Sequence, residues 1–266
     1  MANDTMLKKH PLNVDFEWQQ PQPPYRIITE AQAQAYRETG GFILEDAFSL
    51  DDLAPVTREL DELERSANAG LKDIDPQQPT IARHDEIVFS AHAVTSSKAA
   101  RAFSAHPTLV GLCEDLIGGE VRLYWDQLVY KRPGTEDEFP WHQDNGYSYV
   151  EPQQYLTCWI ALTDATIENG CPWIAPGLHQ HGTLMHKWTD IGFNCMATPD
   201  DAMPMPLRAG SVAVFSSLTP HRTGPNLTQD VRKAYILQYA PEGARVIPRQ
   251  GDAVPANDPA RQYRVN

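Results

Sequence analysis

The stretch VRLYWDQLVYK, residues 121–131, decides the fold that we expect for this chain. It is rich in β-branched and aromatic residues, which favours a β-strand. Similar short runs follow, separated by Pro, Gly, Asn and Asp: YLTCWIALTD, CPWIAPG, GSVAVFSS and RKAYILQYAP. A parallel α/β sheet would need helices between these runs, and no strong helical period appears after residue 120. The pattern therefore predicts an antiparallel sandwich or barrel.

The part before residue 120 carries helix end signals instead. Thr29 is a suitable N-cap for a helix that closes at Gly40, and GFILEDAF then reads as a short strand. A second helix is expected to begin after Ser49, although Pro55 is unfavourable beyond the first turn. A third helix is expected from Pro107, because proline is favoured at the first helical position.

These signals predict one domain over residues 1–266, with a helical N-terminal part packed on a β core. The first ~25 residues are rich in Pro and Gln and predict an extended arm. The expected parts are an arm over 1–28, mainly helical support over 29–119, a β core over 120–240 and a C-terminal tail over 241–266.

Composition limits the classes of partner. Hydrophobic residues make up 41% and charged residues 21% of the 266, as in proteins that bury a core. A formal charge of −13 disfavours nucleic acids and anionic membranes and favours small-molecule partners. No apolar run suits a membrane span or signal peptide, which predicts a cytoplasmic protein. The scattered cysteines predict reduced thiols, and nothing indicates an oligomeric state.

The stretch FPWHQDNGYSY, residues 139–149, contains the first candidate site. On a strand, residues i and i+2 face the same side, so His142 and Asp144 would direct an imidazole and a carboxylate to one point. The pair alone does not distinguish a metal site from a hydrogen-bonded pair in a turn. The same spacing occurs again in His84-Asp85-Glu86.

Residues about 80 positions downstream favour the metal site. His221 follows the run GSVAVFSS in an expected loop that begins with Pro220, and Arg232 starts another expected strand eleven residues later. Two histidines and one carboxylate without a fourth protein ligand suit Fe(II) with open positions, whereas structural zinc usually has four ligands. An arginine beside such a site can hold a carboxylate bidentately.

The order of four motifs resembles the phytanoyl-CoA dioxygenase family. These are W-H-x-D, Y-L-T-C-W, N-G-C-P-W-I-A-P-G-L-H and H-R-T-G-P-N-L-T-Q-D-V-R, and the resemblance covers roughly residues 29–240. Members of this family are Fe(II)- and 2-oxoglutarate-dependent oxygenases. The resemblance implies a mainly β fold, a double-stranded β-helix (jelly roll, cupin-like) core with a helical N-terminal part. It also implies Fe(II), 2-oxoglutarate and O₂ as cofactors.

Matching positions carry the family's roles to this chain. The resemblance implies that His142, Asp144 and His221 are the iron ligands. It implies that Arg232 holds the distal carboxylate of 2-oxoglutarate, helped by Thr223. A structural ion-pair role for Arg232 is the alternative.

Other positions follow from the resemblance with less support. Thr157 and Gln127 lie on strands that line the cosubstrate pocket in this family, or they are ordinary polar strand residues. Further pocket candidates are Lys131 and Trp159. Candidate substrate contacts are Asn145, Arg83 and His84.

Three histidines form a competing cluster. His179 and His181 would share a face if extended, and His186 is near in sequence, so these imidazoles could in principle bind a metal. However, P-G-L-H matches a family loop whose histidine is not an iron ligand, which favours a structural or solvated role. We expect Tyr147 and Tyr149 to be wall and core residues.

The implied reaction is hydroxylation of an unactivated C–H bond of a small molecule, with release of succinate and CO₂. Asp144 argues against the related halogenases, which lack this carboxylate. Desaturation, epoxidation and ring formation remain open. The alternatives are a catalytically silent metal- or ligand-binding β-barrel and a zinc hydrolase with the same triad. No basic cluster suits coenzyme A, so we expect a free small molecule.

Overall fold

A computed structural model describes residues 7–74 and 80–266 of the chain. The described residues form four α-helices, all before residue 120: α1 (Glu30–Thr39), α2 (Leu50–Gly70), α3 (Lys98–Phe103) and α4 (Pro107–Leu116). Short 3₁₀ turns are η1 (Leu71–Asp73), η2 (Ala93–Thr95), η3 (Asp144–Gly146) and η4 (Leu178–His181). None of the described helices combines the length and apolar character that crossing a bilayer requires.

The strands form two main sheets and two small ones. The first strands are β1 (Gly41–Leu44), β2 (Ile87–Ala91), β3 (Val121–Lys131), β4 (Phe139–His142), β5 (Tyr149–Glu151), β6 (Leu156–Ala161), β7 (Pro172–Ile174) and β8 (Lys187–Thr189). The others are β9 (Gly192–Asn194), β10 (Met203–Pro204), β11 (Val212–Ser216), β12 (His221–Thr223), β13 (Arg232–Pro241), β14 (Arg245–Ile247) and β15 (Val254–Pro255).

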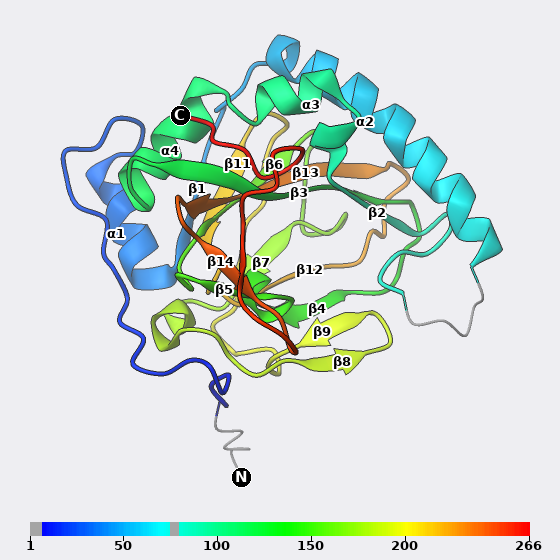
Figure 1. Cartoon of the computed structure of the whole chain (residues 1–266). Helices are drawn as coiled ribbons and strands as arrows, with labels where there is room; N and C mark the ends of the chain where they lie inside the picture. The colour runs from blue at the N-terminus through cyan, green and yellow to red at the C-terminus, as the bar shows by residue number, and fades with distance from the viewer. Residues whose placement is uncertain (1–6, 75–79) are drawn as a thin grey trace.

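The two main sheets face each other. A six-stranded sheet has the order β1-β11-β6-β13-β3-β2, and a four-stranded sheet has the order β10-β7-β12-β4. All pairs are antiparallel, and α2, α3 and α4 cover the outer face of the larger sheet (Figure 1). Trp159 and Phe215 of the larger sheet share a buried cluster with Ile174 of the smaller one. The predicted double-stranded β-helix with a helical N-terminal part is confirmed.

Strand alternation separates two environments in the larger sheet. In β13, one set of residues packs in the cluster beneath the helices: Tyr235, Leu237 and Tyr239. Ala234 and Ile236 point the other way, into the cluster between the sheets. Because successive side chains alternate along a strand, Arg232 and Gln238 share this inner face. The inner face of the sheet is thus where polar side chains gather.

The helix ends follow the sequence signals. Thr29 caps α1 in a capping box, and Gly40 closes the helix with a φ of +86°, a left-handed conformation that suits glycine. Ser49 and Asp52 form a second capping box on α2. Pro55 lies inside α2 without ending it, because the same helix buries an apolar face in the core. These predicted helix starts are confirmed.

Both chain ends are tied to the β core. In the expected arm, described from residue 7, the Asn13 amide donates to the carbonyls of His181 (2.8 Å) and Thr183 (2.9 Å). Residues 241–266, which we expected to form a tail, contain two strands: β14 pairs with β5 and β15 in a three-stranded sheet. Residues 1–6 of the expected arm lie outside the described residues.

A buried acid on the outer face of β3 makes folding stability depend on pH. Asp126 is fully buried and accepts hydrogen bonds from the Tyr235 hydroxyl (2.9 Å) and the Val94 N–H (3.2 Å). Burial nevertheless raises its pKa from 3.8 to about 6. The folded protein therefore keeps this proton to a higher pH than the unfolded chain does. Ionisation then lowers stability as the pH rises from about 4 to about 6.

We expect Asp126→Asn to gain stability relative to wild type at pH 8 by on the order of 2 kcal/mol, because it removes the buried charge. At pH 4 the gain is expected to be close to zero. Urea unfolding at both pH values measures the difference, with the exposed Asp190→Asn as the control. Equal gains at the two pH values would contradict this account.

Candidate metal centre

Two segments that are far apart in sequence bring His142, Asp144 and His221 together. His142 ends β4, and its Cα is the register partner of His221, the first residue of β12. The two imidazole centroids are 4.1 Å apart. One possible ligand atom from each of the three residues lies within 4.8 Å of the other two. Within the described residues this is the one group of this kind.

The local structure around the three residues differs from the prediction. Asp144 is not on a strand with His142, because β4 ends at His142 and η3 begins at Asp144. Gln143 between them is extended, with φ −109° and ψ 144°, so the side chains at i and i+2 still converge. His221 was expected in a loop but begins β12, because it pairs with both β4 and β7.

Backbone carbonyls determine the tautomer of both imidazoles. The Nδ1 of His142 lies 2.8 Å from the Pro140 carbonyl, and the Nδ1 of His221 lies 3.0 Å from the Thr219 carbonyl. A carbonyl oxygen only accepts, so each Nδ1 carries the proton and donates it. Each Nε2 is left with a free lone pair, as a metal-binding imidazole requires.

Burial keeps these imidazoles neutral. It lowers the pKa of His142 to about 3, with a further contribution from His221, and it lowers the pKa of His221 to about 4. Burial also raises the pKa of Asp144, which hydrogen bonds from Thr157 and Gln238 oppose. Histidine binds a metal as the neutral imidazole, and aspartate binds it as the carboxylate.

The side chain of Gln143 joins the two ligand-bearing segments. It is fully buried and points away from the centre. Its amide donates to the carbonyls of Leu218 (2.6 Å) and Gly182 (3.0 Å), and its Oε1 accepts from the Leu184 N–H (2.6 Å). Leu218 lies three residues before His221, so one amide fixes the chain on both sides of the metal centre.

The competing histidines do not gather at a metal site. His186 donates from Nδ1 to the Leu184 carbonyl (2.9 Å) and accepts at Nε2 from the Gln143 N–H (2.9 Å). Its ring fills the space that a Cβ at position 146 would need, which explains Gly146. His179 is buried against the edge of Trp18. His186 therefore supports the loop that carries Asp144.

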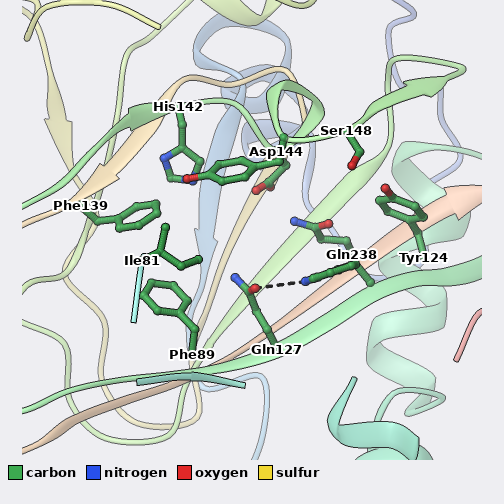
Figure 2. Close-up of a pocket in the computed structure, with 11 residues that line it drawn as sticks. Ile81, Phe89, Tyr124, Gln127, Phe139, His142, Asp144, Ser148 and Gln238 are labelled. Carbon is green, nitrogen blue, oxygen red and sulfur yellow. Dashed lines mark hydrogen bonds between the residues drawn. The ribbon is translucent and has the colours of Figure 1, made fainter. Parts of the chain in front are cut away.

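Two cavities meet at His142 and Asp144, and the smaller one also contacts His221. The smaller has a volume of about 40 Å³ and the larger about 250 Å³. They share five lining residues: Phe89, Gln127, Phe139, His142 and Asp144. Figure 2 shows the larger cavity, with the imidazole and carboxylate on one side and the two phenylalanines below them. A bound metal would be accessible from both cavities.

Arg232 is a fully buried cation beside the smaller cavity. Its guanidinium carbon lies 5.2 Å from the ring centroid of Trp159, which lines that cavity. Within the described residues, its Nε and Nη2 have no hydrogen-bond partner, and Nη1 makes a long contact of 3.4 Å to the Val129 carbonyl. Burial lowers its pKa to about 10. A buried cation without a counter-charge is unfavourable, so this position favours an anionic ligand.

A second buried cation faces the first. Lys131 is the register partner of Arg232 on β3. Its Nζ donates to the carbonyls of Gly224 (2.6 Å) and Asp137 (3.1 Å), and no carboxylate of the described residues forms an ion pair with it. Burial, with the neighbouring Arg232, lowers its pKa to about 7. The two side chains form an incompletely neutralised positive region.

The other predicted cosubstrate residues also lie near the smaller cavity. Thr223 and Thr157 line it, and Gln127 lines both cavities. The Thr157 hydroxyl donates to Oδ2 of Asp144, so its observed contact is with the carboxylate. The Oε1 of Gln127 accepts from the indole N–H of Trp125 (3.1 Å). Their role in cosubstrate binding stays a prediction, and the sequence did not indicate the hydrogen-bond partners of Thr157 and Gln127.

The predicted substrate contacts are not among the residues that line the larger cavity. Asn145 is buried; its amide nitrogen donates to the Thr183 hydroxyl oxygen (2.7 Å), and its Oδ1 accepts from the Val150 N–H (2.8 Å). Arg83 pairs with an aspartate in a neighbouring depression, and His84 contacts its own neighbour Asp85. These positions do not bring the three side chains to the cavity wall. The wall instead contains Tyr124, Trp125, Tyr147 and Gln238.

Comparisons with known proteins agree with this arrangement. A sequence model of the family described as phytanoyl-CoA dioxygenase (PhyH) matches residues 36–234. The chain is 36% identical over 125 residues to "Methylphosphonate hydroxylase" of Gimesia maris, covering 47% of either protein. It is 34% identical over 117 residues to "Phytanoyl-CoA dioxygenase" of Arabidopsis thaliana, covering 41% of either. Each match thus spans less than half of the relative's length.

A solved structure shows the same fold. The epimerase SnoN, in complex with Fe³⁺, alpha ketoglutarate and nogalamycin RO, aligns with a TM-score of 0.71 and 21% identity. The alignment covers 89% of this chain and 98% of that one.

We expect Gln143→Met to weaken Fe(II) binding by about 10–100-fold, because the support of the ligand-bearing loops is lost while every predicted ligand stays in place. The melting temperature is also expected to fall. Anaerobic Fe(II) titration and thermal unfolding measure the two effects. Gln180→Met is the control, since this exposed amide makes a single bond to the Arg37 carbonyl. Unchanged metal affinity in Gln143→Met would contradict a positioning role.

Proposed function

The chain belongs to the phytanoyl-CoA dioxygenase family, and on this premise we propose that it is an Fe(II)- and 2-oxoglutarate-dependent oxygenase. We further propose that it hydroxylates an unactivated C–H bond of a small molecule, with release of succinate and CO₂. The observation that carries the proposal is the three-ligand centre next to a buried, unneutralised arginine.

The donor set suits the proposed iron. His142 and His221 would each supply a neutral Nε2, and Asp144 a carboxylate oxygen. Two imidazoles and one carboxylate leave positions open for exchangeable ligands, which is the arrangement of non-haem Fe(II) oxygenases. Within the described residues no fourth protein ligand joins the group. Structural zinc would normally have one.

The smaller cavity suits the cosubstrate. 2-Oxoglutarate has a carboxylate at each end, and Arg232 has two nitrogens without a hydrogen-bond partner among the described residues, beside Trp159 of the cavity lining. A carboxylate on these donors would neutralise the guanidinium and satisfy its N–H groups. Thr223 would offer a hydroxyl from the same wall. The buried position without a carboxylate partner favours this role of Arg232 over a structural ion pair.

When bound, iron and 2-oxoglutarate supply the oxidising chemistry with O₂. The protein's own residues position the reactants. Thr157 and Gln238 hold the Asp144 carboxylate, and Phe89 and Phe139 form an apolar wall beside the centre that limits access of water. The substrate would occupy the larger cavity, where its orientation selects the C–H bond that reacts.

Asp144 favours hydroxylation over halogenation, because its carboxylate occupies the position that a halide would need. Desaturation, epoxidation and ring formation are alternatives that the same centre permits. A catalytically silent barrel is a further alternative. The complete set of three ligands and a buried arginine supports an enzyme instead. A zinc hydrolase with the same triad would be active with zinc and without O₂.

Anaerobic addition of Fe(II) and then 2-oxoglutarate tests the proposal. We expect a visible charge-transfer band, and we expect Arg232→Ala to weaken 2-oxoglutarate binding at least about 30-fold, because a buried charge pair is lost. The exposed Arg65→Ala is the control. With O₂ the wild type is expected to form succinate. A product one oxygen atom heavier, labelled from ¹⁸O₂, identifies hydroxylation.

No band and no succinate with either protein would support the silent barrel. Turnover with zinc in the absence of O₂ would support the hydrolase. A product that lacks two hydrogens would replace hydroxylation by desaturation.

Lys131 should make cosubstrate binding depend on pH. Its pKa of about 7 is lowered by burial, Arg232 and Arg222, and partly restored by Glu138 and Asp137. A bound dianion favours the charged amine, so binding takes up a proton when the pH is above 7. We therefore expect 2-oxoglutarate affinity to fall by roughly tenfold between pH 7 and pH 9.

Lys131→Met is expected to bind more weakly at pH 7 and to lose this pH dependence. Lys233→Met is the matched control, because this lysine lies on the outer face of the sheet and pairs with Asp61. Calorimetric titration in the presence of Fe(II), without O₂, measures both variants. The same pH slope in Lys131→Met and wild type would contradict the assignment.

A further inference from the structure

The larger cavity has a wall of a particular chemical kind. One end is apolar and consists of Ile81, Phe89 and Phe139 (Figure 2). Aromatic rings of Tyr124 and Trp125 continue the wall on the other side. With a volume of about 250 Å³, the cavity has room for a small molecule of limited size. Such a wall favours an apolar body in the occupant.

Apart from Asp144, the polar groups that the structure describes on this wall are neutral. The Oε1 of Gln127 accepts from Trp125, which turns the amide nitrogen toward the middle of the cavity (Figure 2). Within the described residues, no hydrogen bond is made by this nitrogen. Tyr124 and Ser148 lie at the opposite side (Figure 2). The Gln127 amide therefore offers a donor to a neutral acceptor such as a hydroxyl or carbonyl oxygen.

No positive side chain lines the larger cavity. The sequence has no Lys or Arg in residues 1–6 or 75–79, so every lysine and arginine is among the residues that the structure describes. None of them belongs to the wall. Arg83 lies in the adjoining depression, where Asp137 and Glu86 pair with it. A phosphonate, carboxylate or phosphate in the larger cavity would lose hydration without gaining a positive side chain as its partner.

Among the residues that the structure describes, no free negative side chain lines it either. Asp144 is the single carboxylate among the lining residues, and the proposed function assigns it to the metal. An ammonium group would therefore lie beside a metal cation, without a carboxylate of its own. The smaller cavity differs, because the buried Arg232 lies against Trp159 of its lining and Lys131 is the register partner of Arg232. The two cavities thus separate an anion site from a neutral site.

We propose that the primary substrate is an uncharged molecule with an aliphatic or aromatic body and one hydroxyl or carbonyl group that accepts from Gln127. This inference rests on the proposed function, because it takes the metal and cosubstrate as occupants of the rest of the centre. It separates this chain from a methylphosphonate-type substrate, such as the name of one relative gives for that protein. It also excludes acyl-coenzyme A thioesters.

Three probes with one scaffold test the charge preference: 3-phenylpropan-1-ol, 3-phenylpropanoate and 3-phenylpropan-1-amine. Each is titrated into the anaerobic enzyme loaded with Fe(II) and 2-oxoglutarate, and binding is followed by tryptophan fluorescence, since Trp125 lies on the wall. The alcohol is expected to bind at least about tenfold more tightly than either charged probe. Equal or tighter binding of a charged probe, or no binding of the alcohol at millimolar concentration, overturns the proposal.

A charge introduced into the wall supplies a second test. Ser148 is exposed at the rim, so its replacement should not disturb folding. Ser148→Lys is expected to bind 3-phenylpropanoate about tenfold more tightly than wild type, while the matched Ser148→Gln is not. If both variants bind the carboxylate as wild type does, the missing cation is not what determines the preference, and the proposal is overturned.

Different measurements report the oxygenase activity and the charge preference of the larger cavity. Succinate formation without any probe reports the oxygenase itself. Fluorescence titration reports the preference of the cavity whether or not turnover occurs. If no succinate forms but the alcohol still binds more tightly than the charged probes, only the proposed function is contradicted. If succinate forms normally but a charged probe binds more tightly than the alcohol, only the inference of a neutral substrate is contradicted.

Discussion

The antiparallel pairing of β4 with β12 is the constraint on which the site depends. It sets His142 opposite His221, and directly opposite residues in such a pair have neighbouring side chains. The Asp144 carboxylate then needs only the short turn that follows β4 to reach the same point. Gln143 ties this turn to the chain that leads into β12. The backbone pairing of two strands and the buried side-chain amide of Gln143 thus hold the centre in place.

The larger sheet adds a second level of organisation. Its outer face is apolar beneath the helices, while its inner face carries Arg232, Lys131, Gln127, Thr157 and Gln238. Strand alternation places them on one face, since they occupy same-face positions of three neighbouring strands. The outer side of the sheet thus packs against the helices, and the inner side carries these polar groups beside a second apolar cluster.

The sequence predicts much of this arrangement from local patterns. The runs at 121–131 and 232–241 are strands with the predicted bounds, and the capped starts of α1 and α2 follow their Ser and Thr signals. The convergence of His142, Asp144 and His221 was expected from a resemblance across separate motifs. Local patterns could not show that residues 245–247 join a sheet with β5, or that Gln143 bonds to Leu218. Both depend on partners that only the folded chain brings near.

Phe89, Gln127 and Phe139 belong to both cavities at once. Each of these side chains would contact a molecule in either cavity. If it moves to fit one molecule, the surface that contacts the other molecule changes as well. If occupancy of one chamber changes affinity in its neighbour by some factor, linkage requires the reverse effect to have the same size. The selectivity of one cavity is therefore coupled to the selectivity of the other. A mutation of one of these shared residues that admits a new substrate to the larger cavity is expected also to change the affinity for the molecule in the smaller cavity.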